Sequence, residues 1–433
     1  MYTITLKILN PRQRTTPMSN IGEYNWPLTT LWVGLVTIGL VAIYSATQGP
    51  VAEFLPAYIQ VNFYKQLISF GIALMLIVGL QYVSPRTFRE GSYVFYVVGL
   101  LLMVLTLIFG REVNGATSWL VLGPLNLQTS ELMKIATVLA VANYLTSQRN
   151  LSAENLKTAL TTVLIILVPT VLVFMQNDSG TAIIFLALIP VVLFWSGLPY
   201  GISLFIISPA IIGYLSIIAW YWGLAAAVFL TLLVFILQRR TWLTFTSFAT
   251  GILLVIGVQV ALFQVLQPHQ RARIEAFTNP SFDPQGAGWN IIQAKTAIGS
   301  GGLYGKGYLE GTQTQLRFLP EQWTDFIFCV IGEEFGFAGA GFVVLLLTGF
   351  TIVLLRSAAN HKHPFAQLVI VSVAAIYFTH FFINIGSATA LIPVIGVPLP
   401  FISYGGSALI TNTLMLGICL NLDFHKRQFS IYR

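Results

Sequence analysis

Residues 319–337 read LPEQWTDFIFCVIGEEFGF and continue into an apolar run that reaches residue 355. A run of this length can cross the ~30 Å hydrocarbon layer of a membrane as a helix. Glu321 and Asp325 precede the run, whereas Glu333 and Glu334 lie inside it. Because ionised groups are costly in hydrocarbon, such residues usually face a bundle interior or a wet cavity and mark function. The stretch therefore predicts a membrane helix with carboxylates placed for chemistry where it meets water.

The rest of the chain is equally apolar. Of its 433 residues, 56% are hydrophobic and 9% are charged, whereas a soluble protein carries about 25% charged residues. We predict an all-α fold, a polytopic integral membrane helical bundle of about 10–12 transmembrane helices, with residues 1–433 forming a single membrane domain. Hydropathy places spans near residues 27–47, 66–83, 92–110, 130–147, 159–175, 181–197, 201–219, 222–238, 242–264, 325–355, 364–386 and 408–422.

The distribution of Lys and Arg predicts the orientation. Most of the 22 basic residues fall in inner segments if the N-terminus is cytoplasmic, as the positive-inside rule requires. Residues 1–26 then form a cytoplasmic segment before an uncleaved first helix, and residues 423–433 form a cytoplasmic tail. Loops 111–129, 265–324 and 387–407 share the outer side. The net charge of +7 has the same origin, so we expect no nucleic-acid partner.

The long outer loop 265–324 combines glycines, aromatic residues and single charges, which favours an ordered binding loop over a linker. Glycines at 299–307 would let backbone N–H groups approach phosphate oxygens closely. Such a loop can also be an ordinary turn-rich connection with solvated charges, and composition leaves both interpretations open. The cations that could neutralise a pyrophosphate here are Lys306, Arg317, Arg271 and Arg273.

Two interpretations of Asp325 are equally compatible with its position. It can cap the helix that follows, as Thr324 also could, by accepting a bond from a free N–H group. It can instead be a functional carboxylate. Glu333 and Glu334 lie two turns deeper, and we expect at least one of them to face the bundle interior and to be paired there.

Other polar residues also interrupt predicted spans. Glu131 and Lys134 have the i, i+3 spacing of an intrahelical ion pair, which could also shape a polar cavity. Asp178 precedes a helix start and is expected to be its N-cap. Loop 387–407 is apolar but broken by proline and glycine, which favours a re-entrant or cavity-lining segment over a plain connector. No metal-ligand cluster is visible, and His380 is isolated within a span.

Four motifs together resemble the SEDS family of peptidoglycan glycosyltransferases, over about residues 28–422. They are NGATSWLVLGPLNLQTSELMKIA, QNDSGTA, IGSGGLYGKGYLEGTQTQLRFLPEQWTDFIFCVIGEEFGF and LIPVIGVPLPFISYGGSA. The GKG and GTQ residues before LPEQ favour the elongation-type (RodA) branch over the division-type (FtsW) branch. The resemblance implies polymerisation of lipid II at the outer face of the bacterial cytoplasmic membrane, during cell elongation and shape maintenance. It also implies membrane lipids and a class B penicillin-binding protein, a transpeptidase, as partners.

The resemblance also implies roles for residues. Asp325 would be catalytic, either as the general base for the acceptor sugar hydroxyl or by helping to hold a divalent cation such as Mg²⁺ or Mn²⁺. The residues expected to bind substrate or pyrophosphate, or to line the cavity, are Lys306, Arg317, Arg111, Trp119, Glu131, Lys134, Asp178, Glu321, Glu333, Glu334 and Ser403.

The chain also departs from the family pattern. Thr117 and Ser118 replace basic residues, Trp323 replaces a histidine and Asn177 replaces a proline. The family has ten spans, so two of those predicted here are extra, and we place the additional hairpin within residues 201–264.

Other functions fit some of these features. Cavity-lining carboxylates and broken helices also suit a flippase or transporter for a lipid-linked precursor. An O-antigen-ligase-like transferase uses similar donors, but LPEQWTDF and PLPFISYGG argue against it. A scaffold that binds the transpeptidase is a further alternative. Polymer formation by the purified protein alone would separate the glycosyltransferase from the transporter.

Overall fold

The computed structural model describes residues 24–50, 56–113, 115–122, 125–148, 156–266, 268–283, 286 and 288–426. Every predicted span is a helix in these residues. The helices are α1 (Trp26–Gln48), α3 (Asn62–Leu80), α5 (Ser92–Phe109), α6 (Thr129–Ser147), α7 (Leu156–Met175), α8 (Ser179–Trp195), α9 (Tyr200–Ile218), α10 (Trp220–Gln238), α11 (Thr241–Val260), α15 (Ile327–Asn360), α16 (Pro364–Ala388) and α17 (Gly406–Phe424).

In this part of the chain, ten helices are long and apolar enough to cross a membrane. The two other predicted spans are α6, which carries Glu131 and Lys134, and α8, which has only 17 residues. Both pack inside the bundle, α6 against α5 and α16, and α8 against α7 and α16. The predicted helical membrane bundle is therefore confirmed, and the protein is a multi-pass membrane protein.

Short elements occupy the connections. A π-helix (Ala261–Val265) continues directly from α11. The predicted loop 265–324 contains α12 (Pro268–Thr278), a short 3-10 helix (Pro280–Phe282), α13 (Trp289–Ser300) and α14 (Thr312–Gln315). Two further short helices are α2 (Ala57–Gln60) and α4 (Pro85–Glu90).

Loop 111–129 contains a small antiparallel sheet, ordered β1 (Arg111–Val113), β2 (Ala116–Leu122) and β3 (Leu125–Gln128). The all-α prediction did not include this sheet. Its central strand reads ATSWLVL, rich in the β-branched and aromatic residues that favour strands, and the Thr117 amide donates to Gln176 O across 3.0 Å.

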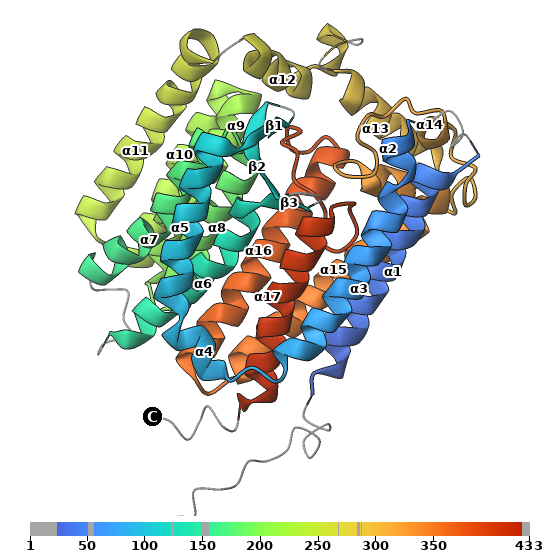
Figure 1. The fold of residues 1–433 in the computed structure, drawn as a ribbon. Helices are drawn as coiled ribbons and strands as arrows, with labels where there is room; N and C mark the ends of the chain where they lie inside the picture. The colour runs from blue at the N-terminus through green and yellow to red at the C-terminus, as the bar shows by residue number, and fades with distance from the viewer. Residues whose placement is uncertain are drawn as a thin grey trace, which may run out of the picture.

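The two ends of the described chain meet at one end of the bundle. Asn25 Nδ2 donates to Asp423 Oδ2 across 2.9 Å, and the rings of Tyr24 and Phe424 are 6.2 Å apart. The sheet and α12, α13 and α14 lie at the opposite end (Figure 1). This agrees with the predicted placement of the three outer loops together, while the side of the membrane that they face stays a prediction. The basic residues predicted inside at 1–23, 149 and 427–433 lie outside the described residues.

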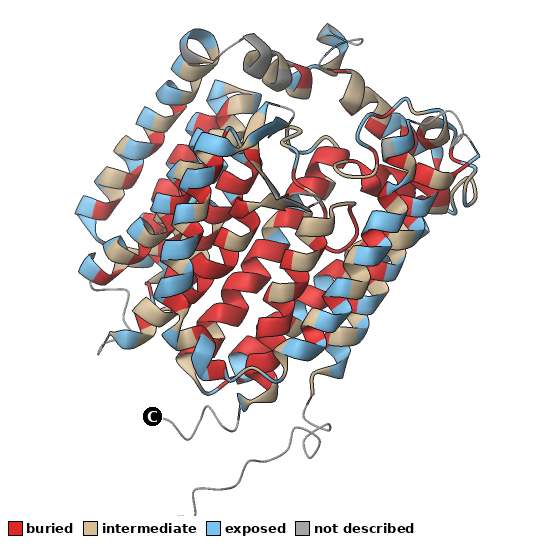
Figure 2. Cartoon of the chain, in the orientation of Figure 1, coloured by how far each residue is buried: buried red, intermediate tan, exposed pale blue. Residues whose placement is uncertain are grey.

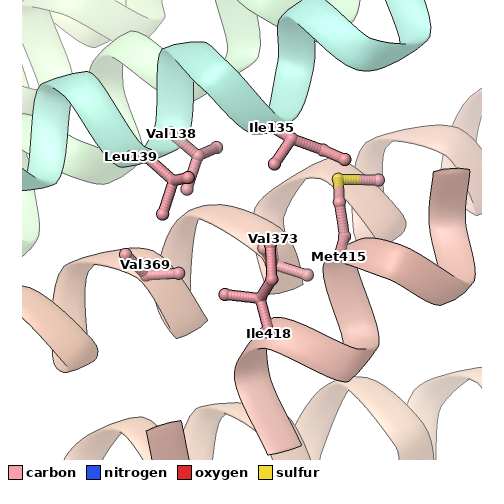
Figure 3. A pocket seen from close by; sticks show the side chains of 7 residues that line it. All are labelled: Ile135, Val138, Leu139, Val369, Val373, Met415 and Ile418. Atoms are coloured by element: carbon pink, nitrogen blue, oxygen red, sulfur yellow. The ribbon is translucent and has the colours of Figure 1, made fainter. Parts of the chain in front are cut away.

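Helix α16 forms the centre of the bundle, and α6, α8, α15 and α17 surround it. The central helices are mostly buried, whereas the outer helices expose one face (Figure 2). An apolar cavity lies between α6, α16 and α17 and is lined by residues such as Val138, Val373 and Ile418 (Figure 3). It has no polar lining side chain, so it is a packing defect of the core and offers no group for chemistry.

Helices α9, α10 and α11 pack mainly on one another and have a small core of their own, which includes Ile212, Ala227 and Leu230. Only Ala219 separates α9 from α10, because its extended backbone (φ −161°, ψ 140°) ends one helix and Trp220 begins the next.

Helix α15 is interrupted at Gly336, whose backbone (φ 66°, ψ −163°) is accessible essentially only to glycine. The glycine-rich segment of residues 302–307 forms backbone hydrogen bonds with α15 on both sides of Gly336. Phe337 N donates to Gly302 O (2.9 Å), and the amides of Lys306 and Gly307 donate to Glu333 O (3.0 Å) and Glu334 O (3.1 Å). The glycines therefore allow close backbone contact with a broken helix, and two of the amides expected to approach phosphate are already bonded.

The irregular residues 389–405, here called the return segment, run from α16 to α17. The apolar side chains of Val397, Leu399, Phe401 and Ile402 are buried, whereas those of residues 390–395 are partly buried or exposed. A Cβ atom on Gly39, in the middle of α1, would lie 2.7 Å from the Ile402 backbone, so the segment enters the bundle between helices. The structure agrees with the predicted irregular backbone buried in protein at membrane depth.

The N-terminus of α16 predicts a pH-dependent stability. His363 is the N-cap, and its Nδ1 accepts a bond from Phe365 N across 3.2 Å. Burial, with smaller contributions from the nearby Arg89 and His361, lowers the pKa of His363 from 6.5 to about 4. The unfolded chain therefore binds more protons than the folded chain between these values, so stability falls as pH drops from about 6.5 to 4.

We expect His363→Asn to remove part of this dependence, because asparagine caps equally well and does not titrate in this range. Thermal midpoints in detergent, measured at pH 7.5 and pH 5, should converge by an amount equivalent to roughly 1 kcal/mol once solvent screening is allowed for. An unchanged difference between the two midpoints would contradict this assignment.

Candidate active site

Asp325 lies in a tight turn, residues 321–326, directly before α15. The amides of Asp325 and Thr324 both donate to Glu321 O, across 3.1 and 3.2 Å. The N-cap of α15 is Phe326, which makes no side-chain capping bond. The capping interpretation is therefore wrong for both Thr324 and Asp325, and the Asp325 carboxylate is left for another role.

Two polar side chains clamp this turn against the return segment. Asn384, on α16, donates from Nδ2 to both Asp325 O (2.9 Å) and Val397 O (2.8 Å). Ser403 donates from Oγ to Thr324 O across 2.6 Å. The predicted site residue Ser403 thus fixes the turn that carries Asp325. Asn384 was not predicted, although a single asparagine within an apolar span was a signal that could have revealed it.

The Asp325 carboxylate is partly buried and faces the exposed backbone of Gly396. A Cβ atom on Gly396 would lie 3.5 Å from Asp325 Oδ2. Burial, with a smaller contribution from the negative charge of Glu321, raises the pKa of Asp325 from 3.8 to about 6. A carboxylate with this pKa is ionised at neutral pH and is a stronger base than an ordinary aspartate, as a general base requires.

The N-terminus of α8 lies against the other side of the return segment. A Cβ atom on Gly180 would lie 2.8 Å from Val397 Cγ2, so glycine permits this approach. Asp178 is the N-cap of α8, as predicted, and accepts bonds from Thr181 N (3.0 Å) and Thr181 Oγ1 (2.8 Å). Gln128 Nε2 also donates to Asp178 Oδ2, across 3.0 Å.

The sheet brings two further predicted residues near this helix end. Trp119 is the register partner of both Gln128 on β3 and Arg111 on β1. Paired residues of neighbouring strands share a face of the sheet. Trp119, which is partly buried, is therefore next to the Asp178 cap, and the exposed Arg111 is next to Trp119.

Glu333 and Lys306 form a separate cluster at the break in α15. Glu333 is fully buried, and its carboxylate accepts bonds from Lys306 Nζ (2.8 Å), Gln313 N (2.8 Å) and Thr314 N (2.9 Å). Lys306 therefore forms an ion pair with Glu333 in the structure, whereas the sequence suggested that Lys306 binds pyrophosphate. Pyrophosphate binding by Lys306 stays a prediction.

Glu334 is buried next to Glu333 and points toward α1. Its Oε1 accepts bonds from Ser45 Oγ and from Gln315 Nε2 (3.1 Å). The expectation that at least one of the two glutamates faces the interior and is paired is confirmed. Both tie the outer loop to the bundle, which makes them anchors of the loop that ends at Asp325.

The predicted ion pair between Glu131 and Lys134 is confirmed. Lys134 Nζ lies 2.7 Å from Glu131 Oε1, and the two side chains are 0% and 3% exposed. Lys134 Nζ also lies 3.0 Å from His380 Nε2. His380 is therefore not isolated, and its contact with α6 could not be inferred because the partners are far apart in sequence.

Two of the remaining cations, Arg317 and Arg271, have contacts in the structure. The Arg317 guanidinium lies 5.5 Å from the centre of the Trp323 ring, two residues from Asp325. Arg271 pairs with Glu275 across 2.6 Å, and the side chain of Arg273 lies outside the described residues. Of these, Arg317 is the cation that the structure places against the Asp325 turn, through its contact with Trp323.

The carboxylates of Asp325 and Glu321 are close enough for their charges to interact. Mg²⁺ is usually bound by one or two carboxylates together with substrate phosphates, and rarely by an all-protein cage. The described residues contain no group of three or more His, Cys, Asp or Glu side chains that could hold a metal. Asp325 with an acidic neighbour is compatible with a divalent cation that is shared with a phosphorylated substrate, and such a cation stays a prediction.

Fold and site together define a polytopic membrane protein with one candidate catalytic carboxylate, Asp325, directly before the N-terminus of the interrupted helix α15. A family profile described as "Cell cycle protein" (FtsW/RodA/SpoVE) matches residues 26–227 and 222–428. The chain therefore belongs to the FtsW/RodA/SpoVE family.

Individual relatives agree with this assignment. The chain is 30% identical to the peptidoglycan glycosyltransferase RodA of Treponema pallidum, over 93% of this chain and 98% of the relative. It is 34% identical to the peptidoglycan glycosyltransferase MrdB of Escherichia coli, over 84% and 85%. A probable peptidoglycan glycosyltransferase FtsW of Pseudoalteromonas translucida is 28% identical, over 98% and 96%.

Solved structures show the same fold. A chain from a peptidoglycan synthase complex that coordinates polymerization and crosslinking is 28% identical and has a TM-score of 0.71, with 94% of this chain and 99% of that chain covered. The rod shape determining protein RodA of Thermus thermophilus is 26% identical, with a TM-score of 0.61 and coverage of 93% and 97%.

Proposed function

We propose that the protein is a peptidoglycan glycosyltransferase that polymerises lipid II at the outer face of the bacterial cytoplasmic membrane. The observation that carries the proposal is the Asp325 carboxylate, which lies beside Gly396 on a turn whose backbone carbonyls are bound by Asn384 and Ser403. Family membership and relatives named as peptidoglycan glycosyltransferases support it. Both termini are then cytoplasmic.

In the proposed reaction, Asp325 accepts the proton of the acceptor sugar hydroxyl as its oxygen attacks the anomeric carbon of the donor. The bond between that carbon and the pyrophosphate oxygen breaks, and polyprenyl pyrophosphate leaves. Arg317, whose guanidinium lies over the Trp323 ring of the Asp325 turn, would stabilise the charge of the leaving group. In the alternative role, Asp325 would instead help to hold a divalent cation such as Mg²⁺ or Mn²⁺, which would neutralise charge on the pyrophosphate.

The elongation-type branch is supported by relatives named RodA and MrdB at 30% and 34% identity. FtsW relatives at 28–30% identity also match. We therefore propose the elongation-type branch separately from the glycosyltransferase activity. A class B penicillin-binding protein is the proposed transpeptidase partner, and a related chain does occur in a peptidoglycan synthase complex. Complementation of rod shape, as opposed to division, in strains lacking each activity would decide the branch.

The deciding experiment uses the purified full-length protein and purified lipid II without a second enzyme. Glycan strands should appear on gels, with and without the transpeptidase, and their dependence on Mg²⁺ or Mn²⁺ is measured in the same series. Translocation of lipid II across vesicle membranes without polymer would instead identify a flippase and would overturn the proposal.

Glu321→Gln gives a prediction for the pH dependence of the reaction. The charge of Glu321 raises the pKa of Asp325, so its removal lowers that pKa. A general base is active when ionised, so the rate of the wild-type protein should rise with pH through about 6. In Glu321→Gln, the rise in kcat/KM for polymerisation should be displaced to lower pH. A displacement to higher pH would show that Glu321 does not act on Asp325 in this way.

A further inference from the structure

The hydrogen bonds of His380 fix its protonation state. Its side chain is buried within α16. The Lys134 ammonium, already paired with Glu131, lies 3.0 Å from Nε2. An ammonium group has donors only, so Nε2 must be the acceptor and His380 is neutral. The ring proton is then on Nδ1, which donates to Pro398 O across 3.1 Å.

His380 and Asn384 act on neighbouring carbonyl groups of the return segment. They are four residues apart on α16 and so share one face of the helix. Asn384 binds Val397 O and, with the same amide nitrogen, the backbone of Asp325. His380 binds the next carbonyl, that of Pro398. One helix face therefore sets the position of the return segment relative to the Asp325 turn.

We propose that His380 is a positioning residue for glycosyl transfer: held by Lys134, it fixes the Pro398 carbonyl and with it Gly396 beside the Asp325 carboxylate. The proposal rests on the proposed function for its kinetic consequence. Small misplacement of a catalytic group can lower a rate about a hundredfold without touching the chemistry. His380 thereby acts on the site through its bond to the Pro398 carbonyl, at a distance from the reacting atoms.

Three variants test whether His380 acts through its bond to Pro398 O or only through its contact with Lys134. In His380→Asn, the amide nitrogen can replace Nδ1 as donor to Pro398, but the side chain is too short to reach Lys134. His380→Gln can replace Nε2 as acceptor from Lys134 and loses the Pro398 bond. His380→Leu loses both bonds. The matched control is Thr379→Val on the same helix, because among the described residues the Thr379 hydroxyl bonds only to Ala375 O of its own helix.

We expect kcat for lipid II polymerisation to fall about 10–100-fold in His380→Leu and His380→Gln, with KM within about twofold of the wild type. His380→Asn should retain most of the wild-type kcat, and Thr379→Val all of it. Retention in His380→Gln together with loss in His380→Asn would overturn the proposal, because it would show that the contact with Lys134 is what matters. Equal loss in both would overturn it too.

A second measurement does not depend on activity. Val397→Cys places a thiol in the return segment at a position that is 4% exposed, and the native Cys329 and Cys419 are buried at 0% and 1%. Labelling by a water-soluble maleimide should be about tenfold faster when His380→Leu or His380→Gln is added, and unchanged with His380→Asn. Equal labelling in all variants would overturn the positioning role. Failure of the wild type to polymerise lipid II would instead overturn the proposed function and leave this test intact.

Discussion

Replacing Asp325 by asparagine should lower the rate of lipid II polymerisation about 10²–10⁴-fold, which is the usual contribution of a general base. Asparagine has nearly the same shape, and the bonds that clamp the turn go to the Asp325 and Thr324 carbonyls. The substitution therefore removes the proton acceptor and leaves the turn in place. The measurement is the initial rate of glycan strand formation by the purified protein.

The matched control is Glu112→Gln, which neutralises an exposed carboxylate on the sheet at the same end of the bundle. It should retain the wild-type rate. Thermal midpoints of both variants should stay near that of the wild type, so that a loss of rate cannot be attributed to unfolding. Full polymerase activity of correctly folded Asp325→Asn would exclude the proposed mechanism.

Glu333→Ala should produce the largest loss of stability. Its buried carboxylate accepts bonds from Lys306 Nζ and from two backbone amides. Removing it leaves a partly buried cation and two donors without their acceptor, which typically costs about 3–5 kcal/mol for a buried ion pair. We expect a clearly lower thermal midpoint in detergent and faster proteolysis of the loop around residues 306–316.

Two further variants locate the cause. Glu333→Gln keeps the volume and one acceptor, so its thermal midpoint should lie between those of Glu333→Ala and the wild type. Glu310→Ala removes an exposed carboxylate from the same loop and should have little effect. A thermal midpoint of Glu333→Ala equal to that of Glu310→Ala would show that Glu333 does not anchor the loop.

The helical bundle could be predicted from the sequence because a span is defined locally, by length and apolarity. The capping role of Asp178 and the pairing of Glu131 with Lys134 were also predictable, since both involve residues within one helical turn. These predictions required no knowledge of how the helices pack.

The features that were missed depend on contacts between distant segments. The bonds of Asn384 to Asp325 and of Lys134 to His380 join residues separated by 59 and 246 positions. The break at Gly336 was also missed, because residues 302–307 complete the hydrogen bonding of the interrupted helix. A local pattern carries no information about such a partner, so Lys306 was assigned to phosphate and Asp325 was left ambiguous.

The contacts of Glu333 and Glu334 also bear on biogenesis. Every side chain that binds their carboxylates comes from Ser45 or from residues 300–315, so all of them are synthesised before α15 leaves the ribosome. A charged residue in an inserting helix costs roughly 2.5–3.5 kcal/mol on the translocon scale at the helix centre, and less toward the helix end, where Glu333 and Glu334 lie. The donors that compensate Glu333 and Glu334 are therefore already translated when α15 emerges from the ribosome. The order of these segments along the chain favours co-translational insertion of α15, which its carboxylates would otherwise make a poor substrate for the translocon.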